Sequence, residues 1–378
     1  RIVGGVGIGV ASIICPLYIS EIAAAQYRGR LVSLYQLAIT IGFVGAYLVN
    51  YMLLGYAEST QPGEGLWSQV FVTEGWRGML GMETLPALLF FIILFIIPES
   101  PRWLMVHSRR DDAERVISRI YSTAAAVKSE VDAVSASIKA QNTGGSSANV
   151  SLLFRPKMFK GLLIGVAIAI LGQFMGVNAV LYYGPTIFEN AGLSSSSSLF
   201  YQVIVDIVNT VTTVAALLII DKVGRKQLVY WGVSGMIVSL LLIAGYFTYG
   251  ASLGLPPVLL LIFFMIYIMC CAGSICAVVW VLLSEMYPTK VRAVAMSIAG
   301  FALWVGTYLV GQLTPVMLET FSAAGVFLIF AAMCVPYILI MWRGVPETTG
   351  KSLEEIEKYW LEDPDAVAAA ASDAGDSL

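Results

Sequence analysis

The sequence predicts an all-α membrane protein, and three observations lead to that prediction. The chain has 378 residues, of which 58% are hydrophobic and only 12% are charged, with a mean hydropathy of +0.80. A soluble domain carries about 25% charged residues, so this composition is typical of a protein that lies in lipid. Apolar runs long enough to cross a bilayer recur along the chain, and basic residues collect in alternate loops between them.

Nine segments are apolar for about 20 residues, which is enough to cross the hydrocarbon core as helices. We expect these spans at residues 2–22, 32–55, 77–97, 161–189, 199–220, 228–249, 256–285, 293–317 and 322–342.

The positive charges predict which loops face the cytoplasm. All but two of the 22 Lys and Arg residues fall within 28–30, 102–160, 222–226, 290–292 and 343–358. The intervening loops contain neither residue type, at 56–76, 190–198, 250–255 and 318–321. By the positive-inside rule the basic loops and the C-terminus are cytoplasmic, so the first span runs from outside to inside.

The polar stretch between the third and fourth spans has apolar residues at helical spacing, which predicts a short helical bundle in water. We therefore divide the chain into the remainder of an N-terminal bundle, a cytoplasmic helical linker, a six-helix C-terminal bundle and a cytoplasmic tail, at 1–97, 98–160, 161–343 and 344–378.

Two motifs occur twice, which indicates two related halves. "SEIAAAQYR" (20–28) is echoed by "SEMYPTKVR" (284–292), and "PESPRWL" (98–104) by "PETTGKSL" (346–353), at nearly the same separation. The first motif follows the fourth span of the later half but the first span of the earlier half. We therefore expect three helices to be missing from the front, and two six-helix halves are a transporter layout.

The chain resembles the sugar-porter family of the major facilitator superfamily, and within it most closely the bacterial D-xylose:proton symporters. The resemblance rests on "YRGR" (27–30), "GQFMGVNAVLYYGP" (172–185), "DKVGRK" (221–226), "VLLSEMYPTKVR" (281–292) and "VPETTGKSLEE" (345–355), beside "PESPRWL". It implies an incomplete major facilitator fold, with the nine spans corresponding to helices 4–12.

The resemblance implies a sugar site built from amides and aromatic rings. Amides donate and accept hydrogen bonds without charge, and an aromatic face covers the C–H side of a sugar ring. The matching residues are Gln36, Gln173, Asn178, Asn209 and Trp280, with Trp304 nearby. Interhelical hydrogen bonding is the alternative for the amides, and plain packing for the tryptophans.

Gln173 and Asn178 present a geometric difficulty, because residues five apart do not share a face of a regular helix. Gly176, Gly184 and Pro185 allow a break or kink there. The resemblance makes Tyr182 and Tyr183 an outer gate, while an interfacial aromatic belt is the alternative.

The chain departs from the family pattern at three places. Gly172 and Leu303 stand where the family has amides, and Cys276 and Ala277 stand where it has a Gly-Pro kink-former. These departures leave the identity of the sugar open.

Two further charged residues, Arg1 and Asp206, are candidates for proton coupling. Arg1 matches a family arginine that, in the proton symporters, neighbours a proton-carrying aspartate on the first helix. Asp206 lies within a span, three residues before Asn209, and an intramembrane acid is a candidate for proton coupling. A neutral or hydrogen-bonded acid near the outer water is the alternative.

The resemblance implies an inner gate of charged residues at the cytoplasmic helix ends, while topology and membrane anchoring are the alternative reading. These residues are Glu21, Arg28, Glu99, Arg102, Asp221, Arg225, Glu285, Arg292 and Glu347.

The sequence thus favours transport of a monosaccharide of the xylose, glucose, galactose or arabinose class by alternating access, with proton symport. An uncoupled uniporter and a non-transporting sugar sensor are the alternatives. We expect a monomer in the cell membrane that needs no metal or cofactor, binds no nucleic acid and is not an enzyme, since His107 is the only histidine. We expect that the 378-residue chain alone does not transport.

Overall fold

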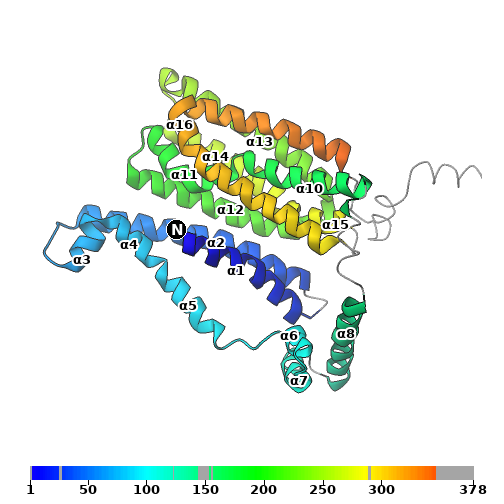
Figure 1. Ribbon diagram of the computed structural model, residues 1–378. Coiled ribbons are helices and arrows are strands. Elements are labelled where there is room, and N and C mark those ends of the chain that lie inside the picture. The colour runs from blue at the N-terminus through cyan, green and yellow to red at the C-terminus, as the bar shows by residue number, and fades with distance from the viewer. Residues whose placement is uncertain are drawn as a thin grey trace, which may run out of the picture. The chain divides into compact units, whose positions relative to one another are not determined.

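A computed structural model gives the fold and describes residues 2–24, 28–121, 123–143, 153–154, 156–287 and 291–345. These residues form helices and connecting turns, with no β-strand among them (Figure 1). The chain divides into two units, Arg1–Gly145 and Ser146–Leu378, and each is described by itself. The all-α membrane fold expected from the sequence is confirmed, while the four-part division of the chain stays a prediction.

The first unit begins with two long helices, α1 (Ile2–Ile22) and α2 (Arg28–Ser59), which pack side by side (Figure 1). A short helix α3 (Leu66–Ser68) and a π-helical turn η1 (Gln69–Thr73) follow. The third expected span is divided into α4 (Gly75–Met82) and α5 (Thr84–Leu94). Because α5 is apolar all round and buries none of its residues within the unit, it suits a lipid environment.

Three short helices occupy the polar stretch, as its helical spacing predicts: α6 (Pro101–Val106), α7 (Arg110–Ser118) and α8 (Ala124–Thr143). The Ser100 side chain accepts a hydrogen bond from the Trp103 amide and so caps α6. The three helices bury small apolar clusters between them, which include Leu104, Ile117 and Val131.

The second unit is a bundle of seven helices in the described residues: α10 (Pro156–Phe174), α11 (Val177–Asn190), α12 (Ser195–Val223), α13 (Arg225–Leu253), α14 (Pro257–Ala272), α15 (Ile275–Met286) and α16 (Arg292–Gly344). α10 and α13 both pack along α16, and α12 packs against α11 and α14. Phe188, Phe264 and Phe327 stack edge-to-face in the core, with neighbouring ring centroids 5.2 and 5.6 Å apart.

Eight helical stretches in the described residues are long and apolar enough to span a membrane. The last runs over Val294–Gly344, 51 residues, and at about 77 Å it is too long for one crossing. Ser322 breaks it with a φ of 61° and a ψ of 162°, and the chain turns back on itself there (Figure 1). This stretch therefore contains two of the nine expected spans, 293–317 and 322–342.

Two further breaks divide expected spans. α10 and α11 are separated at Gly176, whose φ of 94° lies in the left-handed region that glycine tolerates best. α14 and α15 are separated at Gly273 and Ser274, although no proline is present there. The loss of the Gly-Pro kink-former at Cys276 and Ala277 has therefore not left this span as one straight helix.

Candidate functional site

The break at Gly176 brings together the two amides that a regular helix would separate. Gln173 lies in the last turn of α10, and Asn178 lies in the first turn of α11. Asn178 Nδ2 donates a hydrogen bond to Gln173 Oε1 at 2.7 Å. The change of helix direction at Gly176 therefore removes the geometric difficulty that the five-residue spacing raised.

α16 contributes a third polar group to this pair. Thr307 Oγ1 lies 3.1 Å from Gln173 Oε1 and also 3.0 Å from the Leu303 carbonyl oxygen, so its hydroxyl is shared between two acceptors. The helices approach closely here, because a Cβ on Gly306 would lie 3.2 Å from Gln173 Cγ. Gln173 Nε2 and Asn178 Oδ1 have no protein partner in the described part of the chain, and both side chains are only half-buried. These atoms leave both donor and acceptor groups for a ligand.

Two tryptophans adjoin one face of α16: Trp304 belongs to α16, and Trp280 reaches it from α15. Trp304 precedes Thr307 by three residues and follows Gly300 by four, so the three positions share one helix face. The ring of Trp280, from α15, lies 3.6 Å from where a Cβ of Gly300 would be. Trp280 and Trp304 keep 40% and 44% of their surface exposed, so part of each ring is free to cover a ligand.

Asp206 and Asn209 lie on α12, and both are buried, with 0% and 6% of their surface exposed. Asp206 Oδ1 accepts one hydrogen bond, from Gln202 Nε2 at 3.3 Å, and Asp206 Oδ2 has no partner. No part of Asp206 is exposed in this conformation, and its role in proton coupling stays a prediction.

Comparison with known proteins places this arrangement in a family. The model of the family described as "Sugar (and other) transporter" matches residues 1–360. The arabinose-proton symporter of Bacillus subtilis is 36% identical over 361 residues, which are 96% of this chain and 74% of that relative. The D-xylose-proton symporter of Escherichia coli is 36% identical over 366 residues, 95% of this chain and 70% of that relative. The chain belongs to the sugar transporter family.

Solved structures agree with this assignment. The inward-open conformation of the E. coli xylose transporter superposes with a TM-score of 0.79 at 36% identity, covering 95% of this chain and 72% of that one. The E. coli proton:xylose symporter of the major facilitator superfamily, bound to 6-bromo-6-deoxy-D-glucose, gives a TM-score of 0.71 at 36% identity over 95% and 73%. This sugar transporter therefore has the major facilitator fold, and it is an integral membrane protein.

The two expected outer-gate tyrosines of the transporter have different surroundings. Tyr183 donates a hydrogen bond to the Gly311 carbonyl oxygen at 2.7 Å and so ties α11 to α16. Tyr182 is 43% exposed. Their gating role stays a prediction.

The expected inner-gate residues are distributed over both units. Glu21, Glu99 and Arg102 lie in the first unit, where Tyr18 of α1 donates to the Pro98 carbonyl oxygen beside Glu99 at 2.7 Å. In the second unit Arg225 opens α13, and Arg292 Nε donates to the Tyr287 carbonyl oxygen at 3.2 Å. Only the backbone is described for Arg28, Asp221 and Glu285, while Arg1 and Glu347 lie outside the described residues.

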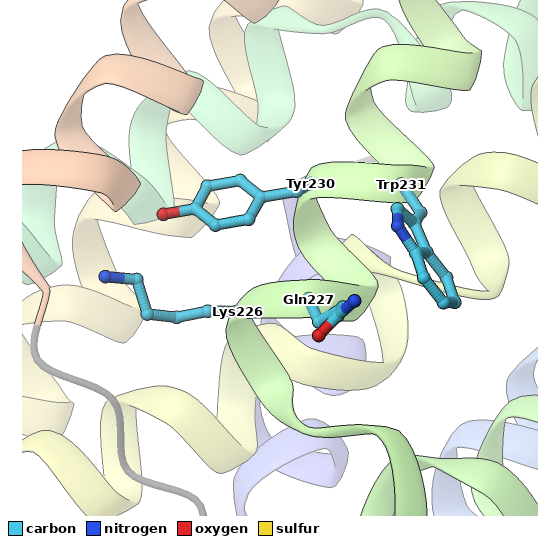
Figure 2. Close-up of a pocket in the computed structure, with 4 residues that line it drawn as sticks. All are labelled: Lys226, Gln227, Tyr230 and Trp231. Atoms are coloured by element: carbon cyan, nitrogen blue, oxygen red, sulfur yellow. The ribbon is translucent and has the colours of Figure 1, made fainter.

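A cavity of about 410 Å³ opens at the start of α13, lined by Lys226, Gln227, Tyr230 and Trp231 (Figure 2). Lys226 and Tyr230 extend to one side of the helix, and Gln227 and Trp231 to the other. Lys226 Nζ donates to the Val345 carbonyl oxygen at 2.8 Å, which holds the end of α16. None of the four is an expected sugar contact.

Of the six expected sugar contacts, Gln173 and Asn178 are joined by a hydrogen bond, while Trp304 lies on the face of α16 that holds Thr307 and Trp280 packs near Gly300 on that face. Asn209 is buried on α12, so its role as a sugar contact stays a prediction. Gln36 is half-buried on α2 in the first unit, so its role stays a prediction. Thr307 was missed; its one sequence signal was its place three residues after Trp304, on the same helix face.

Proposed function

We propose that the protein carries a monosaccharide across the cell membrane by alternating access, together with a proton. The observation that carries this proposal is the pair of hydrogen-bonded amides, Gln173 and Asn178, at a helix break beside Thr307. Discontinuous helices at mid-membrane are where transporters of this architecture bind their substrates. Relatives named as arabinose-, xylose- and galactose-proton symporters support a pentose or hexose as the substrate class.

The free polar atoms of the site suit a sugar. Gln173 Nε2 donates to one hydroxyl and Asn178 Oδ1 accepts from another, while the exposed parts of Trp280 and Trp304 cover the C–H face of the ring. A sugar hydroxyl left without a partner in a dehydrated site costs about 1–3 kcal/mol, so matched amides select for hydroxyl-rich ligands.

Gating in this proposal uses the same helices. The hydrogen bond from Tyr183 to the Gly311 carbonyl oxygen closes α11 on α16 at the outer side. The C-terminus lies inside, and charged residues at the cytoplasmic helix ends pair to close the inner gate and separate to open it. Only a few kcal/mol are needed to shift the equilibrium between the closed and open states.

Proton coupling is assigned to Asp206, since it is the acid in the middle of an apolar span of the second unit. Asp206→Asn is then expected to flatten the pH dependence of sugar uptake. An unchanged pH profile would remove Asp206 from the coupling step.

Sugar counterflow in proteoliposomes tests the transport proposal, with protein made from its complete coding sequence. Vesicles preloaded with unlabelled xylose, arabinose, galactose or glucose are diluted into the labelled sugar. At least one sugar is expected to exchange, and Gln173→Ala with Asn178→Ala is expected to abolish that exchange. Exchange that is indifferent to the double substitution would contradict the assigned site, and no exchange with any monosaccharide would contradict the function.

A further inference from the structure

Two cysteines meet across the break between α14 and α15. Cys271 lies in the last turn of α14, and Cys276 lies in the first turn of α15. On a regular helix, residues five apart point in directions about 140° apart, so their side chains would not meet. The break at Gly273 and Ser274 brings the two sulfur atoms to 3.7 Å, within reach of a weak hydrogen bond between thiols.

The two sulfur atoms are near enough to be joined. Both thiols are free, and the sulfur atoms of a disulfide lie about 2.05 Å apart, so the pair has to close by roughly 1.7 Å. The segment between them is not regular helix, because Ser274 has a φ of −126° and a ψ of −84°. Gly273, which has no side chain, adds conformational freedom there. A disulfide can therefore form without unfolding either helix.

α14 turns the first cysteine toward the break that carries the amide pair. Tyr267 precedes Cys271 by four residues, so the two side chains share one face of α14. The Tyr267 hydroxyl donates a hydrogen bond to the Met175 carbonyl oxygen at 2.8 Å, one residue before Gly176. Cys271 therefore lies on the face of α14 that contacts the break between α10 and α11.

The second cysteine adjoins the amide site through its neighbours in the chain. Gly172 immediately precedes Gln173, and a Cβ on Gly172 would lie 3.8 Å from Cγ2 of Ile275. Ile275 in turn immediately precedes Cys276. Cys276 also precedes Trp280 by four residues, so these two side chains lie on one face of α15. A covalent change at Cys276 is therefore expected to move a ring that the proposed function assigns to the sugar.

The two thiols differ in exposure, which sets the order in which they react. Cys271 is 1% exposed, while Cys276 is half-buried. A passage that admits a monosaccharide also admits hydrogen peroxide, which is smaller and polar. The thiolate is the form of cysteine that attacks a peroxide, and the neighbouring thiol can donate a hydrogen bond to it as it forms. Cys276 is therefore the sulfur that reacts first.

We propose that Cys271 and Cys276 form a redox-sensitive modification site, which hydrogen peroxide converts to a disulfide that weakens sugar binding. The Cys276 sulfur attacks one peroxide oxygen: an S–O bond forms, the O–O bond breaks, and the other oxygen leaves as water with the thiol proton. The Cys271 sulfur then attacks the resulting sulfenic acid: an S–S bond forms, the S–O bond breaks, and a second water leaves with the Cys271 proton. The two thiols together lose two electrons, and the peroxide gains them.

The disulfide acts on sugar binding through Trp280, and this part of the inference rests on the proposed function. Closing the gap draws the first turn of α15 toward α14, and Trp280 follows one turn further along the same helix. A ring displaced by roughly 1 Å loses part of its contact with the sugar, so we expect about two- to ten-fold weaker binding after oxidation.

Peptide mass spectrometry tests the thiol pair, on protein made from its complete coding sequence and held in lipid nanodiscs. After treatment with hydrogen peroxide and alkylation of the remaining thiols, Cys271 and Cys276 are expected to be unalkylated and joined. Cys271→Ser removes the second thiol, so a sulfenic acid should persist at Cys276 and be trapped by dimedone. A wild-type protein that forms no disulfide between these two residues would overturn the proposal.

Calorimetry on the same samples measures the effect on sugar, with whichever of xylose, arabinose, galactose or glucose exchanges in counterflow. Peroxide should weaken binding to the wild type, and dithiothreitol should restore it. Cys276→Ser should bind as the reduced wild type does and be indifferent to peroxide, and it guards against a Cys271→Ser protein that does not fold. Cys270→Ser is the matched control, since a Cβ on Gly235 of α13 would collide with the Cys270 sulfur, which therefore faces another helix. It should respond to peroxide as the wild type does.

Two results would overturn the effect on sugar binding: a disulfide that leaves the affinity unchanged, and a response to peroxide that persists in Cys276→Ser. The mass spectrum requires no sugar, so it decides the thiol pair even if counterflow shows no exchange of any monosaccharide. A failed thiol pair and a failed transport function are therefore told apart.

Discussion

Gln173 Oε1 is the point where three helices of the second unit meet through side chains. It accepts from Asn178 on α11 and lies within hydrogen-bond distance of Thr307 on α16, while Gln173 itself ends α10. A ligand that binds here meets amides whose positions are already fixed. Such preorganisation lowers the entropy lost on binding.

Asn178→Ala removes one acceptor for the sugar and the donor that holds Gln173. We expect the sugar to bind about 10- to 100-fold more weakly, which corresponds to roughly 1.5–3 kcal/mol. Titration calorimetry with the transported sugar measures this change. Asn190→Ala, an exposed asparagine at the end of the same helix, is the matched control and should bind as the wild type does.

Thr307→Val keeps the shape of the side chain and removes its hydroxyl. We expect two- to five-fold weaker sugar binding, or about 0.5–1 kcal/mol, because Gln173 loses an orienting partner. Thr307→Ser should restore the affinity. Thr248→Val, which removes a hydroxyl bonded to the Ala244 carbonyl oxygen on α13, controls for general effects on helices. Equal losses in both valine variants would contradict the role of Thr307.

For single residues, the sequence predicted which side chains belong to the site better than it predicted which side chains they contact. Gln173 and Asn178 stood out because amides are costly in an apolar run. Thr307 did not, because a threonine hydroxyl in a helix commonly bonds the carbonyl four residues back, and it does so here too. Only the approach of α10 to α16 at Gly306 shows that the same hydroxyl also reaches Gln173.

The break between α10 and α11 depends on one glycine. Gly176 has a φ of 94°, and a Cβ there would collide with the ring of Phe330, which is 2% exposed. Both the backbone angle and the packing exclude a side chain at this position.

Gly176→Ala is therefore expected to destabilise the second unit by about 2–4 kcal/mol, from left-handed backbone strain and from the collision in the core. Thermal unfolding in detergent should show a clearly lower midpoint, with weaker sugar binding in the protein that remains folded. Gly245→Ala, within a helix and in open space, should leave the midpoint unchanged or raise it. A Gly176→Ala midpoint equal to that of the wild type would show that the break does not need this conformation.

The stability of the polar helices in the first unit depends on pH. The hydrogen bond from Arg109, with the nearby Arg115, lowers the pKa of the Asp112 carboxyl below its usual value. The folded-state pKa is depressed, so the stabilisation is present above the ordinary carboxyl pKa and is lost as the pH falls through the lowered value.

Asp112→Asn should accordingly speed amide hydrogen exchange in α7 at neutral pH, by a small factor because the pair is exposed. The difference between variant and wild type should shrink as the solution is acidified below the carboxyl range. Asp111→Asn, at the neighbouring position of the same first turn, serves as the comparison. A difference that grows on acidification would contradict the sign of the effect.

Hydropathy predicted where the helices lie, but it did not predict every place where a helix is interrupted. Gly176, Gly184 and Pro185 were all candidates for the bend, and the structure bends at Gly176 and leaves α11 continuous through Pro185. No proline lies at the break at Gly273 and Ser274, so the sequence did not predict this break. Where a helix stops inside a membrane depends on which neighbours fill the space, and hydropathy does not report that.

At the scale of the whole molecule, length, hydropathy and charge pattern were sufficient for the class. The repeated motifs indicated two related halves, and the wider set of motifs resembled the sugar-porter family, which the match over residues 1–360 confirms. The pairing of helices was not predictable in the same way. α14 is apolar on all sides, so its sequence does not say which face meets α12 and which meets α13.

The charge pattern also predicts orientation. A fluorescent protein fused after Leu378 should mature inside the cell, because the basic loops and the C-terminus are expected on the cytoplasmic side. Alkaline phosphatase inserted in the loop at 250–255, which has no Lys or Arg, should be active outside the cytoplasm. The reverse pattern of the two reporters would contradict the assigned topology.

Sugar-dependent proton uptake tests the central claim most directly. Vesicles containing protein made from its complete coding sequence are weakly buffered, a pH dye is placed in the outer medium, and a monosaccharide is added. The account predicts an alkalinisation that starts with the sugar, disappears with a protonophore, and is lost in Asp206→Asn and in the Gln173 and Asn178 double variant. Sugar that enters wild-type vesicles with no movement of protons would contradict proton symport and leave an uncoupled uniporter.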